Sequence, residues 1–145
     1  MSHLTSGSWL LWALLSAAFA ALTAVFAKVG VANVNSDFAT FIRTIVILVV
    51  LGFILAARGL FQPVGSISAK TYLFLGLSGL ATGASWICYF RAMQLGDAAR
   101  VAPVDKLSVV LVAIFGVLFL GEHLELRNWV GVLMIVGGII LVAIR

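Results

Sequence analysis

The sequence predicts an all-α fold, a polytopic membrane bundle of five transmembrane helices. First, the chain is 63% hydrophobic and 10% charged, whereas a soluble domain is about 45–50% apolar and about 25% charged. Second, five apolar runs are close to the roughly 20 residues that cross a bilayer as a helix. Third, the connections are short and rich in Asn, Asp, Gly and Pro, which end helices and form turns. The lipid bilayer is therefore a predicted partner.

The five helices are expected to follow one another in a single domain that covers residues 1–145. Their predicted spans are residues 9–27, 38–57, 72–93, 101–120 and 128–144. These runs are too long and too evenly apolar for the alternating strands of a membrane barrel. The first run is also longer than the usual 7–15-residue core of a signal peptide, and no Lys or Arg precedes it. We therefore interpret it as a retained helix.

The composition argues against several classes of function. The net charge is +4, but no basic run or aromatic-interleaved patch favours nucleic-acid binding. Cys88 is the single cysteine, so no internal disulfide is possible, and His3 and His123 are too far apart in sequence to indicate a metal site. No catalytic motif or phosphate-binding glycine loop is found. The sequence thus predicts no enzyme, no cofactor and no metal.

The charges that flank the helices give a weak orientation signal. Five helices place the termini on opposite sides, and the flanking cations number three on the N-terminal side and four on the other. They are Arg58, Lys70 and Arg127 against Lys28, Arg91, Arg100 and Arg145. If Arg43 and Lys106 are added to the C-terminal side, the cations number three against six. The positive-inside rule then places the C-terminal side in the cytoplasm. Near-balance is expected of a chain that inserts in both orientations.

Four charged residues lie inside apolar runs, where a charge usually faces the bundle or a water-filled cavity. They are Arg43, Arg91, Asp105 and Lys106, and all lie toward the C-terminal side, with each roughly 3–9 Å inside its run. One interpretation is a charged vestibule for an anionic or zwitterionic solute. The other is that they reach the interface and anchor the helices. Asp105 could equally form an internal ion pair with Lys106, Arg43 or Arg91.

The third helix carries a polar stripe. Ser78, Thr82, Ser85 and Tyr89 follow steps of four, three and four, which places them on one helix face, and Trp86 borders that face. The functional interpretation is a pathway lining with an aromatic binding surface. Alternatively, the hydroxyl groups bond across helices or to their own backbone. Trp9, Trp12 and Trp129 lie at helix ends and are expected to be interface anchors.

Some residues are expected to have structural roles only. Small residues at spacings of four, such as Gly79 and Gly83, predict close helix packing. Pro103 is placed at the start of the fourth helix, where a missing N–H is tolerated. Glu122 lies in a turn beside His123, which favours a cap or a loop contact over a role as a proton carrier.

Two runs resemble the EamA-type domain of the drug/metabolite transporter superfamily. The run SWICYFRAMQLGDAARVAP at 85–103 resembles the junction of its third and fourth helices. The run FLGEHLELRNWVGVLMIVGG at 119–138 resembles its closing signature, with a Leu-Gly-Glu turn and a Trp at the start of the last helix. Residues 37–43 resemble the start of its second helix. The similarity covers nearly the whole chain, although the Asp105-Lys106 pair is unlike the mostly apolar stretch of larger members.

The resemblance implies a ten-helix transporter of two inverted repeats, of which this chain supplies one. The substrate site of such a transporter lies at the repeat interface, so a partner is implied, either an antiparallel homodimer or a paralogous half-transporter. The implied activity is transport, by export or uptake, of small metabolites such as amino acids in the bacterial cytoplasmic (inner) membrane, and export is our expectation. The resemblance also brings Arg43, Trp86 and Tyr89 near the central pathway. Alternatives are a non-transporting structural or partner subunit and a small multidrug exporter, although the latter family has an acid in its first helix that this chain lacks.

Overall fold

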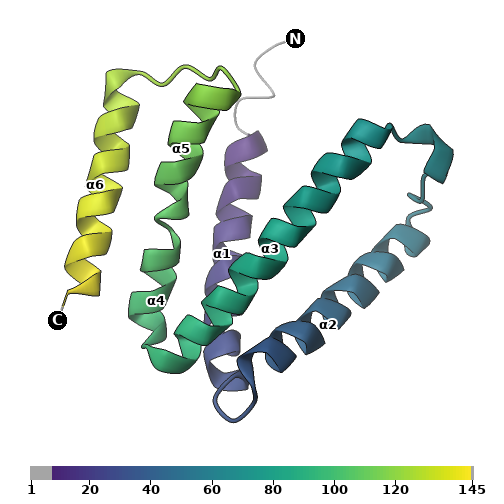
Figure 1. Ribbon diagram of the computed structural model, residues 1–145, viewed down its shortest axis with the longest axis horizontal. Coiled ribbons are helices and arrows are strands. Elements are labelled where there is room, and N and C mark those ends of the chain that lie inside the picture. Colours follow the sequence, from purple (N-terminus) through teal and green to yellow (C-terminus); the bar gives the residue numbers. More distant parts are fainter. Residues whose placement is uncertain (1–7, 145) are drawn as a thin grey trace. The chain divides into compact units, whose positions relative to one another are not determined.

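The computed structural model describes residues 8–144, and this part of the chain is helical and contains no strand. Five helices are long and apolar enough to cross a membrane, as predicted. The elements, shown in Figure 1, are α1 (Ser8–Gly30), α2 (Ser36–Ala57), the short 3-10 helix η1 (Val64–Ser66), α3 (Ala69–Leu95), α4 (Ala98–Asp105), α5 (Ser108–Phe119) and α6 (Leu126–Ala143). The fourth membrane span comprises α4 and α5 together.

The chain divides into two compact units. The α2–α3 unit comprises Phe26–Gln94 and thus contains the last turn of α1 with α2, η1 and α3. The α4–α6 unit comprises Met1–Val25 and Leu95–Arg145, of which residues 8–25 and 95–144 are described. In the α4–α6 unit, α6 packs along both α4 and α5, and Ile139 of α6 is buried. In the α2–α3 unit, the buried residues gather at one end, near the α1–α2 turn and the end of α3. They are Ala27, Val31, Ser36, Thr40, Phe90 and Met93.

Local hydrogen bonds fix both ends of α2. The Asn35 side chain accepts hydrogen bonds from the backbone N–H groups of Asp37 and Phe38, at 2.9 and 3.1 Å. This is the preferred chemistry of a helix N-cap, because the first N–H groups have no partner inside the helix. At the other end, Gly59 has φ +61, its N–H donates to the Ala56 carbonyl, and the Leu60 N–H donates to the Leu55 carbonyl. These two bonds form a Schellman motif, which requires the left-handed glycine.

The fourth span differs from its prediction, because it begins earlier and is broken. The helix starts at Ala98 rather than residue 101, so Pro103 lies inside α4 and not at its start. Proline has no N–H and clashes with the carbonyl four residues before it. The helix ends at Asp105, two residues after Pro103. The N–H groups of Lys106 and Leu107 then donate to carbonyls three residues back, those of Pro103 and Val104. The predicted continuous helix 101–120 is therefore two helices, α4 and α5.

The end of α5 is fixed by Gly121, which has φ +68. The Gly116 carbonyl accepts hydrogen bonds from the N–H groups of Leu120 and Glu122, at 3.1 and 3.0 Å. The turn brings the Glu122 carboxylate over Gly116, where a Cβ atom would lie 2.5 Å from Glu122 Oε2. Gly116 is buried. Glu122 thus closes the end of α5, in agreement with the structural role expected from the sequence.

The glycines of α3 do not pack as the sequence suggested. At Gly79 and Gly83, no heavy atom lies within 4 Å of the position that a Cβ would take. The same holds for Gly131, Gly137 and Gly138 of α6. At Gly116, by contrast, a Cβ would meet the Glu122 side chain. The prediction that Gly79 and Gly83 allow close packing is therefore wrong for helices of their own unit.

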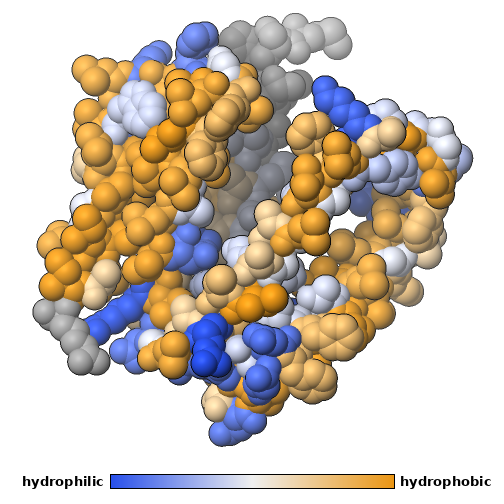
Figure 2. Space-filling model, viewed as in Figure 1, coloured by the Kyte–Doolittle hydropathy of each residue, from blue (hydrophilic) through white to orange (hydrophobic). Residues whose placement is uncertain are grey.

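The long sides of the helices are apolar and exposed. Large hydrophobic side chains with more than half of their surface exposed occur on every span, for example Trp12, Phe53, Leu80, Leu118 and Leu141. Figure 2 shows apolar side chains over most of the visible length of α5 and α6 and hydrophilic ones mainly near helix ends. This surface suits the hydrocarbon core of a membrane. The protein is an integral membrane protein.

Candidate functional site

Arg43 lies within the membrane span formed by α2. It is the eighth residue of the helix that starts at Ser36, so it lies about 10 Å beyond the helix start. Its side chain is half-buried, and its guanidinium carbon lies 4.0 Å from the centroid of the Trp86 ring and 5.4 Å from that of Phe90. Both distances are within the range of cation–π attraction. The side chain therefore bridges α2 and α3.

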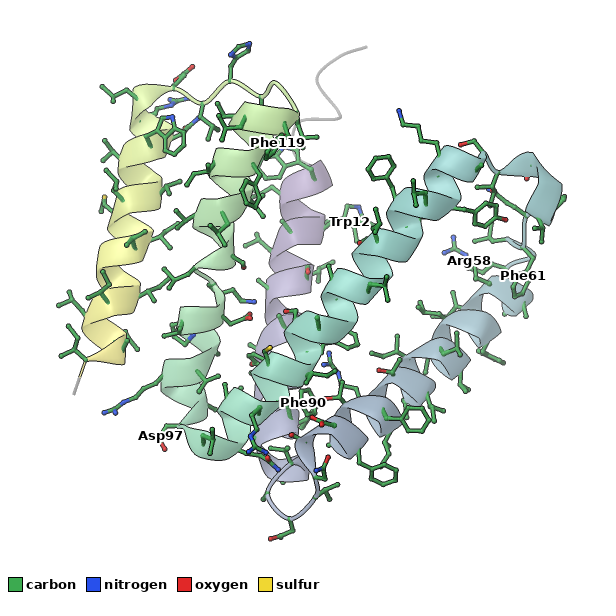
Figure 3. All side chains as sticks on the ribbon, in the orientation of Figure 1. Trp12, Arg58, Phe61, Phe90, Asp97 and Phe119 are labelled. Carbon is green, nitrogen blue, oxygen red and sulfur yellow. The ribbon has the colours of Figure 1, made fainter. Side chains whose placement is uncertain are left out.

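The aromatic side of this contact comes from α3. Trp86 and Phe90 are four residues apart, which places them on the same helix face. Phe90 is buried with 3% of its surface exposed, and Trp86 and Tyr89 are half-buried. The Tyr89 and Phe90 rings meet edge to face, with centroids 6.4 Å apart. Figure 3 shows Phe90 on α3 near the start of α2, whereas Arg58 and Phe61 lie at the opposite end of α2.

Three hydrogen bonds hold the end of α3 against the last turn of α1 and the turn that precedes α2. Lys28 Nζ donates to the Met93 carbonyl at 2.8 Å. Gln94 Nε2 donates to the carbonyls of Val31 and Val34, at 3.1 and 2.6 Å. Lys28 itself belongs to the last turn of α1. Its ammonium lies beside the last turn of α3, where a positive charge is favoured by the helix dipole. These bonds fix the end of α3 beside the start of α2, and thus the separation of Trp86 and Arg43.

The threonines beside Arg43 bond within their own helix. Thr40 Oγ1 donates to the Ser36 carbonyl at 2.9 Å, and Thr44 Oγ1 donates to the Thr40 carbonyl at 2.8 Å. Thr40 is buried, with 6% of its surface exposed. Each hydroxyl proton therefore has a backbone partner, and the oxygens can still accept a hydrogen bond. Of the polar groups on this face of α2, the Arg43 guanidinium is the one that offers N–H donors.

The polar stripe of α3 has a partly structural role. Thr82 Oγ1 donates to the Ser78 carbonyl at 2.8 Å, which is the backbone bonding that the sequence left open as an alternative. Thr82 and Ser85 are exposed, and of the stripe only Tyr89 is half-buried. The stripe therefore leads along α3 toward the contact of Arg43 with Trp86.

The other charged residues predicted for the site are described within their own units. Arg91 is exposed on α3. In the α4–α6 unit, Lys106 Nζ lies 3.1 Å from Asp105 Oδ2. Of the three ion pairs that the sequence allowed for Asp105, the structure shows the one with Lys106. This pair is located where α4 ends and α5 has not begun. The charged vestibule that would join these residues to Arg43 stays a prediction.

Several residues of the site were not identified from the sequence. Phe90 contacts Arg43, and Lys28 and Gln94 fix the helix ends. Phe90 could have been found from its four-residue spacing to Trp86. Lys28 and Gln94 gave no such signal, because their partners are backbone carbonyls, which every residue has.

The described residues contain no group of three or more His, Cys, Asp or Glu side chains that could hold a metal ion. His3, considered with His123 in the sequence, lies outside the described residues. The arrangement found is instead a fixed cation on an aromatic surface inside a membrane span. Such a site can bind the anionic group of a solute.

Comparison with known proteins gives a family for the chain. The model of the EamA-like transporter family matches residues 7–144. A protein of Sinorhizobium sp, described as an uncharacterized transporter in the cobO 3' region, is 69% identical over 139 residues. The aligned part covers 96% of this chain and 99% of that protein. No solved structure matches the chain significantly. The chain therefore belongs to the EamA-like transporter family.

Proposed function

We propose that the chain exports small metabolites, such as amino acids or related compounds, by alternating access as a dimer in the bacterial cytoplasmic membrane. The observation that carries the proposal is the half-buried Arg43 on the Trp86 ring within a membrane span. A charge inside a span is costly, so it generally serves a pathway. The solute would pass along the face formed by Arg43, Trp86 and Tyr89, with Thr82, Ser85 and Arg91 lining its approach. Asp105 and Lys106 are proposed as further pathway residues.

The number of helices supports the proposed dimer. Transporters built from inverted repeats bind their substrate where two repeats meet, and this chain has one repeat of five helices. The Sinorhizobium relative, matched over 99% of its length, is about as long as one such repeat. The near-balance of flanking charges supports an antiparallel homodimer, and a paralogous half-transporter is the other candidate partner.

Membrane topology tests the dimer. Two reporters are fused separately after Arg145, one active only in the cytoplasm and one active only outside it. We expect both to be active at comparable levels, because an antiparallel homodimer needs both orientations. Activity of only one reporter would overturn the inverted homodimer and leave a partner of opposite orientation as the alternative.

Metabolite release tests the transport. Cells that express the chain are compared with cells that express Arg43→Ala at equal membrane abundance, and the medium is analysed by mass spectrometry. We expect at least one small metabolite to accumulate outside cells with the unsubstituted chain and with Arg58→Ala, but not with Arg43→Ala. Arg58→Ala is the matched control, because Arg58 is an exposed arginine at the other end of α2. Identical media for all three would favour a structural subunit.

A further inference from the structure

The positive charge of Arg43 is not balanced within its own unit. Residues 26–94 contain five cationic side chains and one acidic side chain. The cations are Lys28, Arg43, Arg58, Lys70 and Arg91, and the acid is Asp37. Asp37 lies exposed in the first turn of α2, where it accepts a hydrogen bond from the Ser36 hydroxyl at 3.2 Å. Over residues 8–144, no carboxylate lies within ion-pair distance of Arg43.

The guanidinium also retains its hydrogen-bonding capacity. Arginine has five N–H donors in a planar fork, and among the described atoms none accepts a hydrogen bond from Arg43. The contact with Trp86, at 4.0 Å, holds the guanidinium against the ring. A guanidinium fixed in this way loses less entropy when it binds a planar anion through two parallel N–H groups. The site thus provides both the charge and the geometry for a carboxylate.

The number of nearby cations limits the charge of the ligand. Lys28 Nζ is directed to the Met93 carbonyl at 2.8 Å, and Arg91 is exposed. One guanidinium neutralises one carboxylate, whereas a phosphate dianion would retain a net negative charge inside the span, which is costly. The surroundings that Trp86, Tyr89 and Phe90 provide are aromatic and partly buried, so they favour an apolar body next to the charged group.

We propose that Arg43, held on Trp86, binds the carboxylate of the transported solute, and that the site selects monocarboxylates with an apolar body. This inference rests on the proposed transport function and assigns it a class of substrate. Neutral amides and amines of the same shape are excluded, because they leave the guanidinium without a counter-ion in the membrane. Inorganic phosphate is excluded by its second charge.

Equilibrium binding to the purified full chain in lipid nanodiscs tests the inference. Hexanoate, hexanamide and hexylamine share an apolar body and differ in the charge of the head group. Binding is followed by the fluorescence of Trp86 after Trp9, Trp12 and Trp129 are changed to Phe, and by calorimetry on the unsubstituted chain. We expect saturable binding of hexanoate, with an affinity at least roughly tenfold higher than for the amide, the amine or phosphate, since one charged hydrogen-bonding group gives about this factor.

Variants assign the binding to Arg43. Arg43→Gln should weaken hexanoate binding at least roughly tenfold, and Arg43→Lys should weaken it less, because lysine keeps the charge and loses the planar fork. Arg58→Gln should leave the affinity unchanged. The inference is overturned if hexanoate does not bind, if hexanamide or hexylamine binds as well as hexanoate, if phosphate binds more tightly, or if Arg43→Gln binds hexanoate normally.

Flux measurements separate this inference from the transport function. In proteoliposomes, hexanoate that binds as expected but is not transported contradicts the function and leaves the carboxylate site standing. Transport of a cationic or uncharged solute that is unaffected by Arg43→Gln contradicts the carboxylate site and leaves the transport function standing.

Discussion

The guanidinium of Arg43 lies 4.0 Å from the centre of the Trp86 ring, and this contact joins α2 to α3 through two residues that are 43 positions apart in the sequence. Cation–π attraction is strongest on tryptophan and increases when water is excluded. The contact therefore stabilises the charge of Arg43 inside the span and fixes the orientation of its guanidinium. A substitution of the ring should affect function through Arg43.

Trp86→Ala is expected to lower metabolite release by roughly tenfold, because a desolvated cation–π contact contributes about 1–2 kcal/mol and about 1.4 kcal/mol is a factor of ten. Trp86→Phe should retain an intermediate rate, since phenylalanine keeps a weaker ring. Trp12→Ala is the control, because Trp12 is 70% exposed on α1. Equal release by Trp86→Ala and the unsubstituted chain would show that the ring does not contribute to transport.

The sequence predicted the number and order of the helices because hydropathy and length alone decide which segments cross a membrane. It did not predict the break at Lys106, and it placed the start of this helix three residues late. With the start at 101, Pro103 lay in a tolerated first turn. With the start at Ala98, the same proline lies inside the helix, where it removes the bond to the carbonyl four residues before it.

The sequence identified Arg43 and Trp86 separately but not their contact. Arg43 was found because a charge in an apolar run is unusual, and Trp86 because it borders a stripe of helical period. Which face of α2 meets which face of α3 depends on the turn at 31–35 and its bonds to Gln94. No local pattern contains that information.

Gln94→Glu should destabilise the protein. At pH 7–8 an ionised carboxylate can only accept hydrogen bonds, and it would face the Val31 and Val34 carbonyls that Gln94 now donates to. We expect a loss of about 1–3 kcal/mol, measured as a lower thermal midpoint in detergent. Gln62→Glu, at an exposed position outside the helices, should leave the midpoint unchanged. Equal midpoints for both variants would contradict the role of Gln94.

Asn35→Ala should lower the free energy of unfolding by about 1 kcal/mol, because the Asn35 side chain accepts hydrogen bonds from the N–H groups of Asp37 and Phe38 at the start of α2. Asn35→Asp should retain most of the stability, since aspartate is an equally good cap. The nearby Asn33→Ala is the control, because Asn33 is exposed in the same turn. Thermal midpoints of the variants test this prediction. A larger drop in midpoint for Asn33→Ala than for Asn35→Ala would refute the assignment of the cap.

Gly121→Ala should lower the free energy of unfolding by about 1–2 kcal/mol, because the left-handed conformation at φ +68 is unfavourable for a residue with a Cβ. Gly65→Ala is the control, since its Cβ would meet no atom within 4 Å and its φ is not positive. Thermal unfolding of the two variants tests this. If Gly121→Ala unfolds at the same temperature as Gly65→Ala, the turn after α5 does not depend on the glycine.

The pair formed by Asp105 and Lys106 allows function to be separated from stability. The two side chains are 33% and 57% exposed, so replacing either by Ala should change the free energy of unfolding by less than about 1 kcal/mol. Their position at the break between α4 and α5 is nevertheless where transporters place binding groups. We therefore expect each Ala variant to reduce metabolite release several-fold at unchanged stability.

Glu125 and Arg127, an exposed pair 3.0 Å apart at the start of α6, provide matched Ala controls that should alter neither quantity. Normal release by Asp105→Ala and Lys106→Ala would remove the pair from the pathway.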